Sequence, residues 1–105
     1  MQNNEIKRLV NLTIICKTKE KEKMLKLVQQ KEGHLTNVIY GKGSCKRGTF
    51  AQVFGLDDDY KKAIITTLMY EENANSVIEE LNTVYNFNKE NTGIAFVVLV
   101  EGILF

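Results

Sequence analysis

The sequence predicts an α+β protein, in which four strands form one antiparallel sheet and two helices pack on one face of that sheet. Two observations support this prediction. Short apolar, β-branched runs alternate with stretches of helical periodicity, in the order strand, helix, strand, strand, helix, strand. A shift of 53 residues also places Thr13 on Thr66 and the first helix on the second, so the chain reads as two β-α-β units.

The length of the chain allows one hydrophobic core. It has 105 residues and a mass of 12.0 kDa, too little for a second core, so we expect a single domain over residues 1–105. Hydrophobic residues make up 44% and charged residues 26%, as in globular proteins, which excludes disorder as the main state.

The first β-α-β unit is predicted before residue 44. Leu9–Cys16 is apolar and β-branched, and its alternation with polar residues indicates a strand with one face more buried than the other. Thr18 is expected to cap the helix that follows, because its hydroxyl can accept a bond from a free N–H of the first turn. Gly33 lies where that helix should end. A second strand, Asn37–Tyr40, is closed by Gly41-Lys42-Gly43.

The second unit is predicted from residue 60 onward. Tyr60–Met69 has the composition of a strand, and Asn73 is expected to cap the second helix. Gly93–Val100 is a continuous apolar run, which predicts a strand buried on both faces. Between the two units, Ser44–Gly55 is predicted to hold a short helical turn, because its three large apolar residues fall at i, i+3 and i+4.

Two such units interleave into the ferredoxin-like arrangement, with a right-handed crossover in each. Both helices then lie on one face, and the other face lacks a cover. We place Ala63, Ile65, Phe96 and Val98 on that other face, and these residues are too apolar to face water. The chain is therefore expected to associate with copies of itself through the sheet.

Charge is unevenly distributed along the chain. Residues 1–47 contain eleven Lys and Arg against four Asp and Glu, whereas residues 48–105 contain three against nine. Both halves can be solvated faces; alternatively, the basic half supplies an anion site and the acidic half helps subunits to meet. The net charge of +1 lacks the basic excess of nucleic-acid-binding proteins, so we expect no nucleic-acid partner.

The sequence also limits the compartment and the metal chemistry. It contains no apolar run of the roughly 20 residues that span a membrane, and its N-terminus lacks the apolar core of a signal peptide. We therefore expect a cytoplasmic protein with no membrane span. Two cysteines are too few for a disulfide scaffold and too sparse for a zinc site.

Catalytic side chains are not arranged in a pattern that predicts an enzyme. His34, the single histidine, is expected to be an exposed loop residue. Cys45 is flanked by basic residues that can lower its pKa, but the sequence places no histidine beside it. Asp57-Asp58-Asp59 lacks the spacing of a calcium loop and is expected to be a solvated turn. We predict no enzymatic activity, no catalytic residue and no metal site.

The candidate binding segment is Gly41-Lys42-Gly43-Ser44-Cys45-Lys46-Arg47-Gly48. Glycines at a strand end allow the backbone to approach a ligand and present N–H groups to an anion. Lys42, Lys46 and Arg47 add positive charge there. The spacing matches neither the Walker loop nor the dinucleotide fingerprint, so a glycine-rich turn with a solvated basic edge is an equally good interpretation.

Several stretches resemble the PII-like signalling protein family, within the nitrogen regulatory protein PII superfamily. They are the Gly41-Lys42-Gly43 segment, Phe54-Gly55-Leu56, the Tyr70-Glu71-Glu72 turn and the strand beginning at Gly93. The resemblance extends from Leu9 to Val100. This sequence is similar to a short-loop, divergent member.

The resemblance implies a homotrimer with the sheets facing inward, and a regulatory protein rather than an enzyme. It implies binding of ATP, ADP, AMP or another small anionic effector between subunits, no obligatory cofactor, and an unknown partner protein under regulation. By position it carries the nucleotide or anion site to Gly41, Gly43, Leu68, Asn91, Thr92 and Gly93. The candidate binding segment adds Lys42, Ser44, Lys46 and Arg47 to this site. Ile94 stands where the family has a phosphate-binding lysine, and we expect Lys42, Lys46 and Arg47 to replace its charge.

A second interpretation stays open. The same topology occurs in CutA-like and ACT-like assemblies, whose role is structural, metal-related or small-molecule sensing. An RNA-binding protein of this topology needs stacking aromatics, where the third strand has Ile64-Ile65-Thr66-Thr67. An acylphosphatase-like enzyme needs an arginine-bearing loop after the first strand, and Lys17-Thr18-Lys19-Glu20 does not resemble one.

Overall fold

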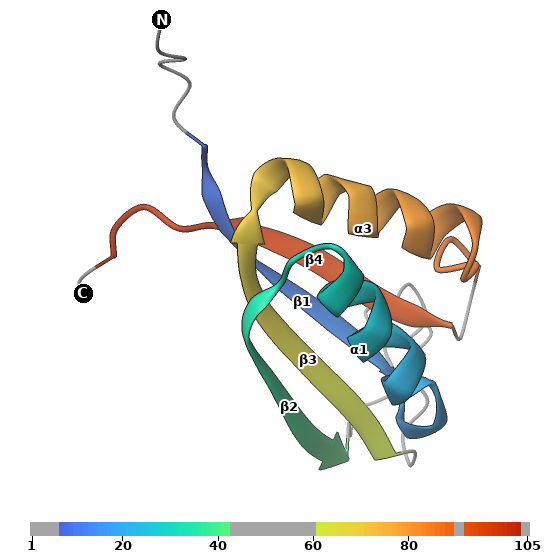
Figure 1. The fold of residues 1–105 in the computed structure, drawn as a ribbon. Coiled ribbons are helices and arrows are strands. Elements are labelled where there is room, and N and C mark those ends of the chain that lie inside the picture. The colour runs from blue at the N-terminus through green and yellow to red at the C-terminus, as the bar shows by residue number, and fades with distance from the viewer. Residues whose placement is uncertain (1–6, 43–60, 90–91, 104–105) are drawn as a thin grey trace, which may run out of the picture.

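The computed structural model describes residues 7–42, 61–89 and 92–103 of the chain. The elements follow one another in the predicted order, with a 3-10 turn, η1, before the first helix (Figure 1). Their bounds are β1 Leu9–Lys17, η1 Thr18–Glu20, α1 Lys21–Gln30, β2 His34–Lys42, β3 Lys61–Tyr70, α3 Glu71–Thr83 and β4 Gly93–Leu99. The helical turn expected within Ser44–Gly55 lies outside the described residues.

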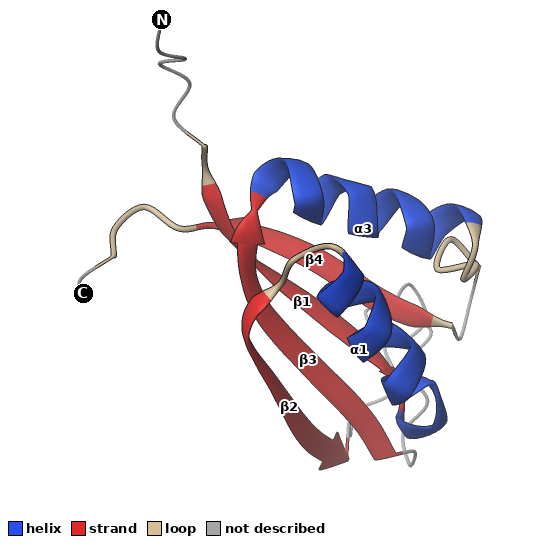
Figure 2. Ribbon diagram, viewed as in Figure 1, coloured by secondary structure: helices blue, strands red, loops and turns tan. Residues whose placement is uncertain are grey.

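The four strands form one antiparallel sheet in the order β2-β3-β1-β4. Both helices lie on the same face of this sheet, and its other face carries no helix among the described residues (Figure 1, Figure 2). This is the ferredoxin-like α+β fold that the sequence predicts.

The internal repeat has a counterpart at the centre of the sheet. Thr13 of β1 and Thr66 of β3, which the shift of 53 residues superimposes, are also paired across the two central strands. Two halves that meet at equivalent residues in antiparallel strands are related by an approximate two-fold rotation. The repeat is therefore a property of the fold as well as of the sequence.

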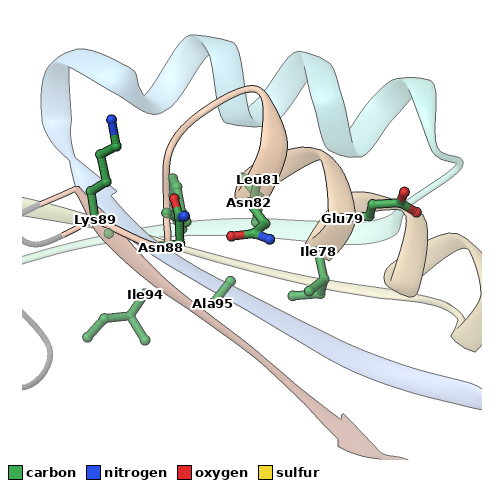
Figure 3. Close-up of a pocket in the computed structure, with 10 residues that line it drawn as sticks. Ile78, Glu79, Leu81, Asn82, Asn88, Lys89, Ile94 and Ala95 are labelled. Carbon is green, nitrogen blue, oxygen red and sulfur yellow. The ribbon is translucent and has the colours of Figure 1, made fainter.

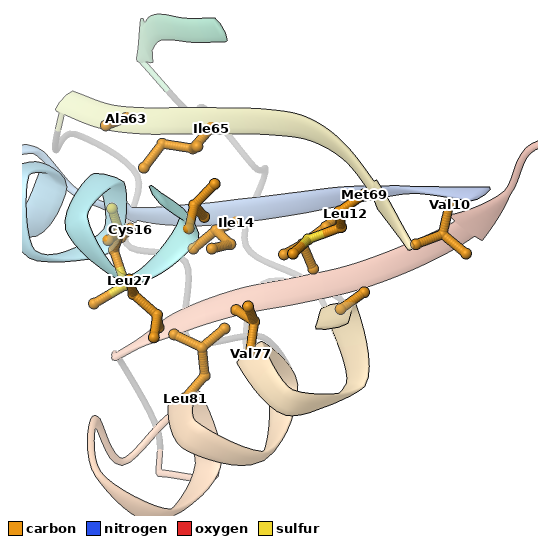
Figure 4. Packing of buried hydrophobic residues seen from close by; sticks show 13 residues of the cluster. Val10, Leu12, Ile14, Cys16, Leu27, Ala63, Ile65, Met69, Val77 and Leu81 are labelled. Atoms are coloured by element: carbon orange, nitrogen blue, oxygen red, sulfur yellow. The ribbon is translucent and has the colours of Figure 1, made fainter. Parts of the chain in front are cut away.

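The hydrophobic core lies between the sheet and the two helices (Figure 4). It is built from alternate residues of the central strands and from the inner faces of both helices. Its buried members are Val10, Leu12, Ile14, Cys16, Met24, Leu27, Val28, Ala63, Ile65, Met69, Ala74, Val77 and Leu81.

The assignment of residues to the uncovered face was half right. Ala63 and Ile65 are fully buried on the helix side, because their positions in β3 alternate with those that point to the uncovered face. Phe96 and Val98 do lie on the uncovered face and are 46% and 54% exposed. An apolar open face therefore exists, but its β3 members are Ile64 and the residues in phase with it.

The last strand is not buried on both faces as its composition suggests. In the chain alone, β4 is an edge strand that pairs only with β1 among the described strands, and three of its seven residues are exposed. A continuous apolar run cannot distinguish a central strand from an edge strand that a second chain can cover.

Both predicted helix caps are wrong. The Thr18 hydroxyl donates to the carbonyl of Lys61 at 2.9 Å, so it joins the end of β1 to the start of β3 instead of capping α1. Asn73 lies inside α3, which begins two residues earlier at Glu71. The N–H of Glu71 donates to the carbonyl of Arg8 at 2.9 Å, so a neighbouring backbone takes the role of a capping side chain.

Helix α1 ends in a Schellman motif. The N–H of Gly33 donates to the carbonyl of Val28 at 2.9 Å, and Glu32 takes the left-handed conformation at φ 61°. A Cβ on Gly33 would overlap Val28 Cγ1 and lie 2.5 Å from Thr67 Oγ1. Glycine is therefore needed at the predicted end of the helix for close packing, while its neighbour supplies the unusual φ.

Neither helix in the described part of the chain has the length and apolar character needed to cross a bilayer. Among the same residues, no group of three or more His, Cys, Asp or Glu side chains is gathered as a metal site would require.

Candidate functional site

The predicted site residues that the structure describes lie mainly at one end of the sheet. Gly41 and Lys42 end β2, and Thr92 and Gly93 lead into β4 at the same end. Because β2 and β4 are the two edges of a four-stranded sheet, the segments are about 14 Å apart, at about 4.8 Å per strand spacing.

One predicted residue lies elsewhere. Leu68 is paired with Asn11 and His34, six residues along β3 from the strand's lysine end. At about 3.3 Å per residue, it is roughly 20 Å from Lys62 within the same chain. Five predicted residues lie outside the described part of the chain: Gly43, Ser44, Lys46, Arg47 and Asn91.

The two described glycines of the predicted site have different environments. A Cβ on Gly41 would meet no described atom within 4 Å, so the fold does not require glycine there and the backbone is open to approach. A Cβ on Gly93 would lie 2.7 Å from the Phe87 ring and 2.8 Å from the Ile15 carbonyl oxygen. Gly93 is therefore needed to seat Phe87 against the start of β4.

The strand register brings together lysines that are not among the predicted site residues. Lys62 of β3 pairs with Gly41 on one side and Lys17 of β1 on the other. Gly93 pairs with Cys16, so Thr92 comes next to Lys17. We call this line across the sheet end, Gly41–Lys62–Lys17–Thr92, the cationic row. One position further out, Lys61 pairs with Lys42, so lysine is paired with lysine at two successive positions.

An apolar row lies beside the cationic row on the same open face. It consists of four isoleucines, one from each strand, joined through successive pairs: Ile39, Ile64, Ile15 and Ile94. Side chains of directly paired residues point to the same face, so the four form one strip across the sheet. We call this strip the isoleucine row.

Lys62 is the least exposed charged residue in the described part of the chain, with 8% of its surface accessible. The four ion pairs found among the described residues involve Lys7, Lys21, Lys23 and Lys31, and none involves Lys62 or Lys17. Glu20, at the end of η1, is paired with Lys23 at 3.3 Å. Among the described residues, the two lysines of the cationic row are therefore not paired with a carboxylate.

The described cysteine is not a nucleophile at neutral pH. Burial raises the pKa of the Cys16 thiol to about 11, and the negative charge of Glu20 contributes to this rise, while the positive charge of Lys62 acts in the opposite direction. Cys16 is part of the core on the helix side. His34 is exposed, as expected, but it begins β2 and is therefore a strand residue rather than a loop residue. Cys45 and Asp57–Asp59 lie outside the described residues.

A pocket of about 420 Å³ lies between α3 and β4 (Figure 3). Ile78 and Asn82 of α3 form one side, and Ala95 of β4 forms the other. Ile94 also belongs to the lining, although its side chain leaves β4 on the open face. Lys89 also belongs to its lining. The pocket is thus apolar between the two elements, with amide and charged groups at its rim, which is the usual make-up of a small-molecule site.

A second pocket, of about 300 Å³, lies where β1 leads into α1. It is lined by three lysines of this connection, Lys17, Lys19 and Lys23, and by Glu20, which is paired with Lys23. Residues of the loop after α3, including Thr92, complete the lining. Positive charge therefore extends from the cationic row around the end of β1.

Solved structures with the same fold include PII-like proteins. A PII-like signaling protein from Thermus thermophilus gives a TM-score of 0.66 at 21% identity, over 88% of this chain and 86% of that chain. CPII from Thiomonas intermedia, bound to ADP, AMP and acetate, gives 0.68 at 19% identity, over 91% and 89%. No protein-family model and no curated protein matches the chain.

The fold also occurs inside a larger protein. A Bacillus cereus protein related to NIF3 gives a TM-score of 0.67 at 10% identity, over 96% of this chain and 27% of that chain. Structural similarity at such low sequence identity shows the fold alone, so function has to be argued from the site. In fold and in order of elements, the chain resembles the PII-like signalling proteins, as its sequence predicts.

Proposed function

We propose that the protein is a PII-like regulatory protein, which binds a small anionic effector and passes its binding state to a partner protein without catalysing a reaction. The observation that supports this most directly is the cationic row beside the isoleucine row. Together they offer a ligand one cationic and one apolar contact surface on the same face of the sheet. An adenine nucleotide has the matching anionic and apolar parts.

Each row would contact a different part of such a ligand. The base would lie between the isoleucine row and a neighbouring subunit, where apolar area is removed from water, at roughly 25 cal/mol per Å². The phosphates would lie on the cationic row, near the open backbone of Gly41. Lys42, Gly43, Ser44, Lys46 and Arg47 follow in the chain and belong to the same proposed site, as do Asn91, Thr92 and Gly93 on the opposite edge.

The structures of similar fold support the choice of effector. CPII is described bound to ADP, AMP and acetate, and also to ADP, AMP and bicarbonate. These are anions of the size and type that a short cationic row can hold. For this chain we therefore propose an adenine nucleotide as the effector, in the cytoplasm, with nitrogen regulation as the role that the resemblance implies.

The open face favours a homotrimer. Phe96 and Val98 are about half exposed there, and Ile39 on the opposite edge is 57% exposed. Three copies with their sheets inward would cover these residues and place the sheet ends at subunit boundaries. Leu68, remote from the cationic row within one chain, would then belong to the site only through a neighbouring subunit.

A thermal-shift panel tests the choice of effector. ATP, ADP, AMP, cyclic AMP, 2-oxoglutarate and bicarbonate are each added at millimolar concentration. A ligand at about 100 times its Kd adds roughly 2.7 kcal/mol to the free energy of unfolding, which raises Tm by several degrees. We expect adenine nucleotides to give the largest rise. If no ligand of the panel raises Tm, the proposed effector class is wrong.

Charge reversal tests the segment after β2. In a Lys46→Glu, Arg47→Glu double variant, we expect nucleotide affinity to fall at least tenfold, because two attractive charges become repulsive ones. Lys26→Glu, at an exposed position of α1, is the matched control and should bind as the wild type does. Unchanged affinity in the double variant would remove these two residues from the site.

The pocket between α3 and β4 favours one other candidate, an ACT-like small-molecule sensor. Its apolar sides and its rim of Glu79, Asn82 and Lys89 suit a small zwitterion with an apolar body, such as an amino acid. A thermal-shift panel of the amino acids separates the candidates. A rise that an Asn82→Ala, Lys89→Ala variant loses would favour the sensor over the nucleotide-binding protein.

A further inference from the structure

We propose that Lys62 and Lys17 together bind the phosphoryl group of the effector, from the open face of the sheet. This deepens the proposed function and rests on it for the identity of the whole ligand. It assigns the contact with the anion to two strand residues that the structure describes.

The first support is the placement of the two side chains. Lys62 and Lys17 are directly paired in the antiparallel register of β3 and β1, so both leave the sheet on the same face. The Cα atoms of such pairs lie roughly 4.5 to 5.5 Å apart. Like charges directly opposite each other destabilise a sheet, and a shared anion removes that repulsion.

The second support is the burial of Lys62. The residue keeps only 8% of its surface accessible, and no acidic group is paired with it among the described residues. Lysines are almost never this buried unless they are paired. The described residues also contain no fully enclosed, unsatisfied side-chain nitrogen. The ammonium of Lys62 is therefore not sealed off from solvent, although the residue as a whole is buried.

The third support is the field around Lys62. Its positive charge acts on the Cys16 thiol of the neighbouring strand, so it lies close to the end of the core. The thiol itself is neutral and offers no counter-charge. Glu20, whose charge also acts on this thiol, is held by Lys23. An incoming anion would therefore meet little competition from the described acidic residues.

These observations favour a phosphoryl group over a single carboxylate. Two ammonium groups on one face match a group that carries close to two negative charges and three acceptor oxygens. Bound partly out of water, such contacts are stronger than the same contacts at an open surface. The source of the group, free phosphate or the end of a nucleotide, is distinguished by the experiment.

The experiment titrates inorganic phosphate, pyrophosphate and ADP into the full-length wild type at low ionic strength and follows Tm and heat. The test variants are Lys62→Met and Lys17→Met, which keep the apolar stem and remove the charge. Lys26→Met, at an exposed position without an ion pair among the described residues, is the matched control. We expect pyrophosphate affinity to fall at least tenfold in each test variant and to stay unchanged in the control.

The unliganded variants give an independent readout. Since Lys62 has no ion pair among the described residues to lose, Lys62→Met should unfold at the wild-type Tm or above it. A lysine that served the fold through a carboxylate partner would instead give a lower Tm, and that result would overturn the proposal. If Lys62→Met does not fold, the proposal is also overturned for Lys62, and Lys17→Met decides whether the neighbouring lysine binds the anion alone.

Failure of this inference and failure of the proposed function give different results. Pyrophosphate binding that both variants retain overturns the lysine pair and leaves nucleotide binding open. Pyrophosphate binding that both variants lose, together with no binding of ADP to the wild type, supports the lysine pair and contradicts the nucleotide effector. Loss of both ligands in both variants supports the two proposals together.

Discussion

At the scale of single residues, the two described glycines of the candidate site have different roles. Gly93 is required by packing, because a Cβ would press on the Phe87 ring and on the Ile15 carbonyl oxygen, whereas Gly41 has open space around it. A glycine in a binding segment is commonly interpreted as a feature for the ligand. Here the fold already requires glycine at position 93, so only at Gly41 does the glycine itself point to a ligand.

The two glycines therefore form a matched pair for mutation. We expect Gly93→Ala to lower the free energy of unfolding by roughly 1 to 3 kcal/mol, because the new methyl group overlaps backbone and ring atoms. Gly41→Ala should be neutral, or stabilising by up to about 1 kcal/mol, because it restricts the unfolded chain without a clash. Urea unfolding measures both. Equal stability of the two variants would contradict this account of Gly93.

The Cys16 thiol gives a pH prediction at the same scale. Its pKa rises from 9.0 to about 11 on folding, so above pH 9 the unfolded chain binds fewer protons than the folded one and stability falls as pH rises. The loss should reach roughly 2 kcal/mol by about pH 11. Other groups titrate in this range, so the measurement is the difference between wild type and Cys16→Ala in urea unfolding at about pH 8 and about pH 10.5. A constant difference would show that the thiol does not contribute.

At the scale of elements, the alternation of apolar runs and helical stretches was sufficient to predict order, type and approximate bounds. The capping errors lie where one element meets another. The side chain of Asn73 suits a cap, but β3 continues into α3 at once and the carbonyl of Arg8 accepts a hydrogen bond from the first free N–H. Capping propensity describes a chain in isolation and cannot foresee a neighbouring strand.

The candidate site was only partly predictable for the same reason. Gly41, Lys42 and Gly93 were accessible to sequence analysis because they end or begin strands. Lys62 and Lys17 became neighbours only through the β1–β3 register, which is set by how the apolar residues of both strands alternate. The signal that could have revealed them was present: extending the Thr13–Thr66 equivalence into an antiparallel pair places Lys17 opposite Lys62.

The register itself makes a prediction. A disulfide between β1 and β3 should form readily in Asn11→Cys, Leu68→Cys, because these residues are directly paired on the open face. The control, Asn11→Cys with Thr66→Cys, offsets the pair by two residues and should form the bond far less readily. Mass spectrometry after mild oxidation measures both. Equal yields would contradict the assigned register.

At the scale of the whole molecule, the contacts within one chain do not explain why the open face is apolar. The isoleucine row and the exposed side chains of Phe96 and Val98 form an apolar surface that a second chain can cover. One chain weighs 12.0 kDa, so the proposed trimer would weigh about 36 kDa. That the domain extends over residues 1–105 stays a prediction.

A charge on the open face should dissociate the assembly. In Val98→Lys, the buried ammonium would oppose association, so we expect light scattering to report the mass of one chain. Val84→Lys is the matched control, because Val84 is 61% exposed but lies beyond the end of α3, away from the open face. A wild type that is already a monomer, or a trimer that survives in Val98→Lys, would contradict association through this face.

The junction of β3 and α3 has a consequence for how the molecule opens. Tyr70 ends the strand and Glu71 begins the helix, and the latter's N–H is held by the carbonyl of Arg8. With no loop to absorb a displacement, the strand that carries Lys62 and the helix at its other end should unfold as one cooperative unit. Native-state hydrogen exchange would then show the amides of β3 and of the first turns of α3 sharing one opening free energy, and an anion at Lys62 would slow exchange as far away as the helix.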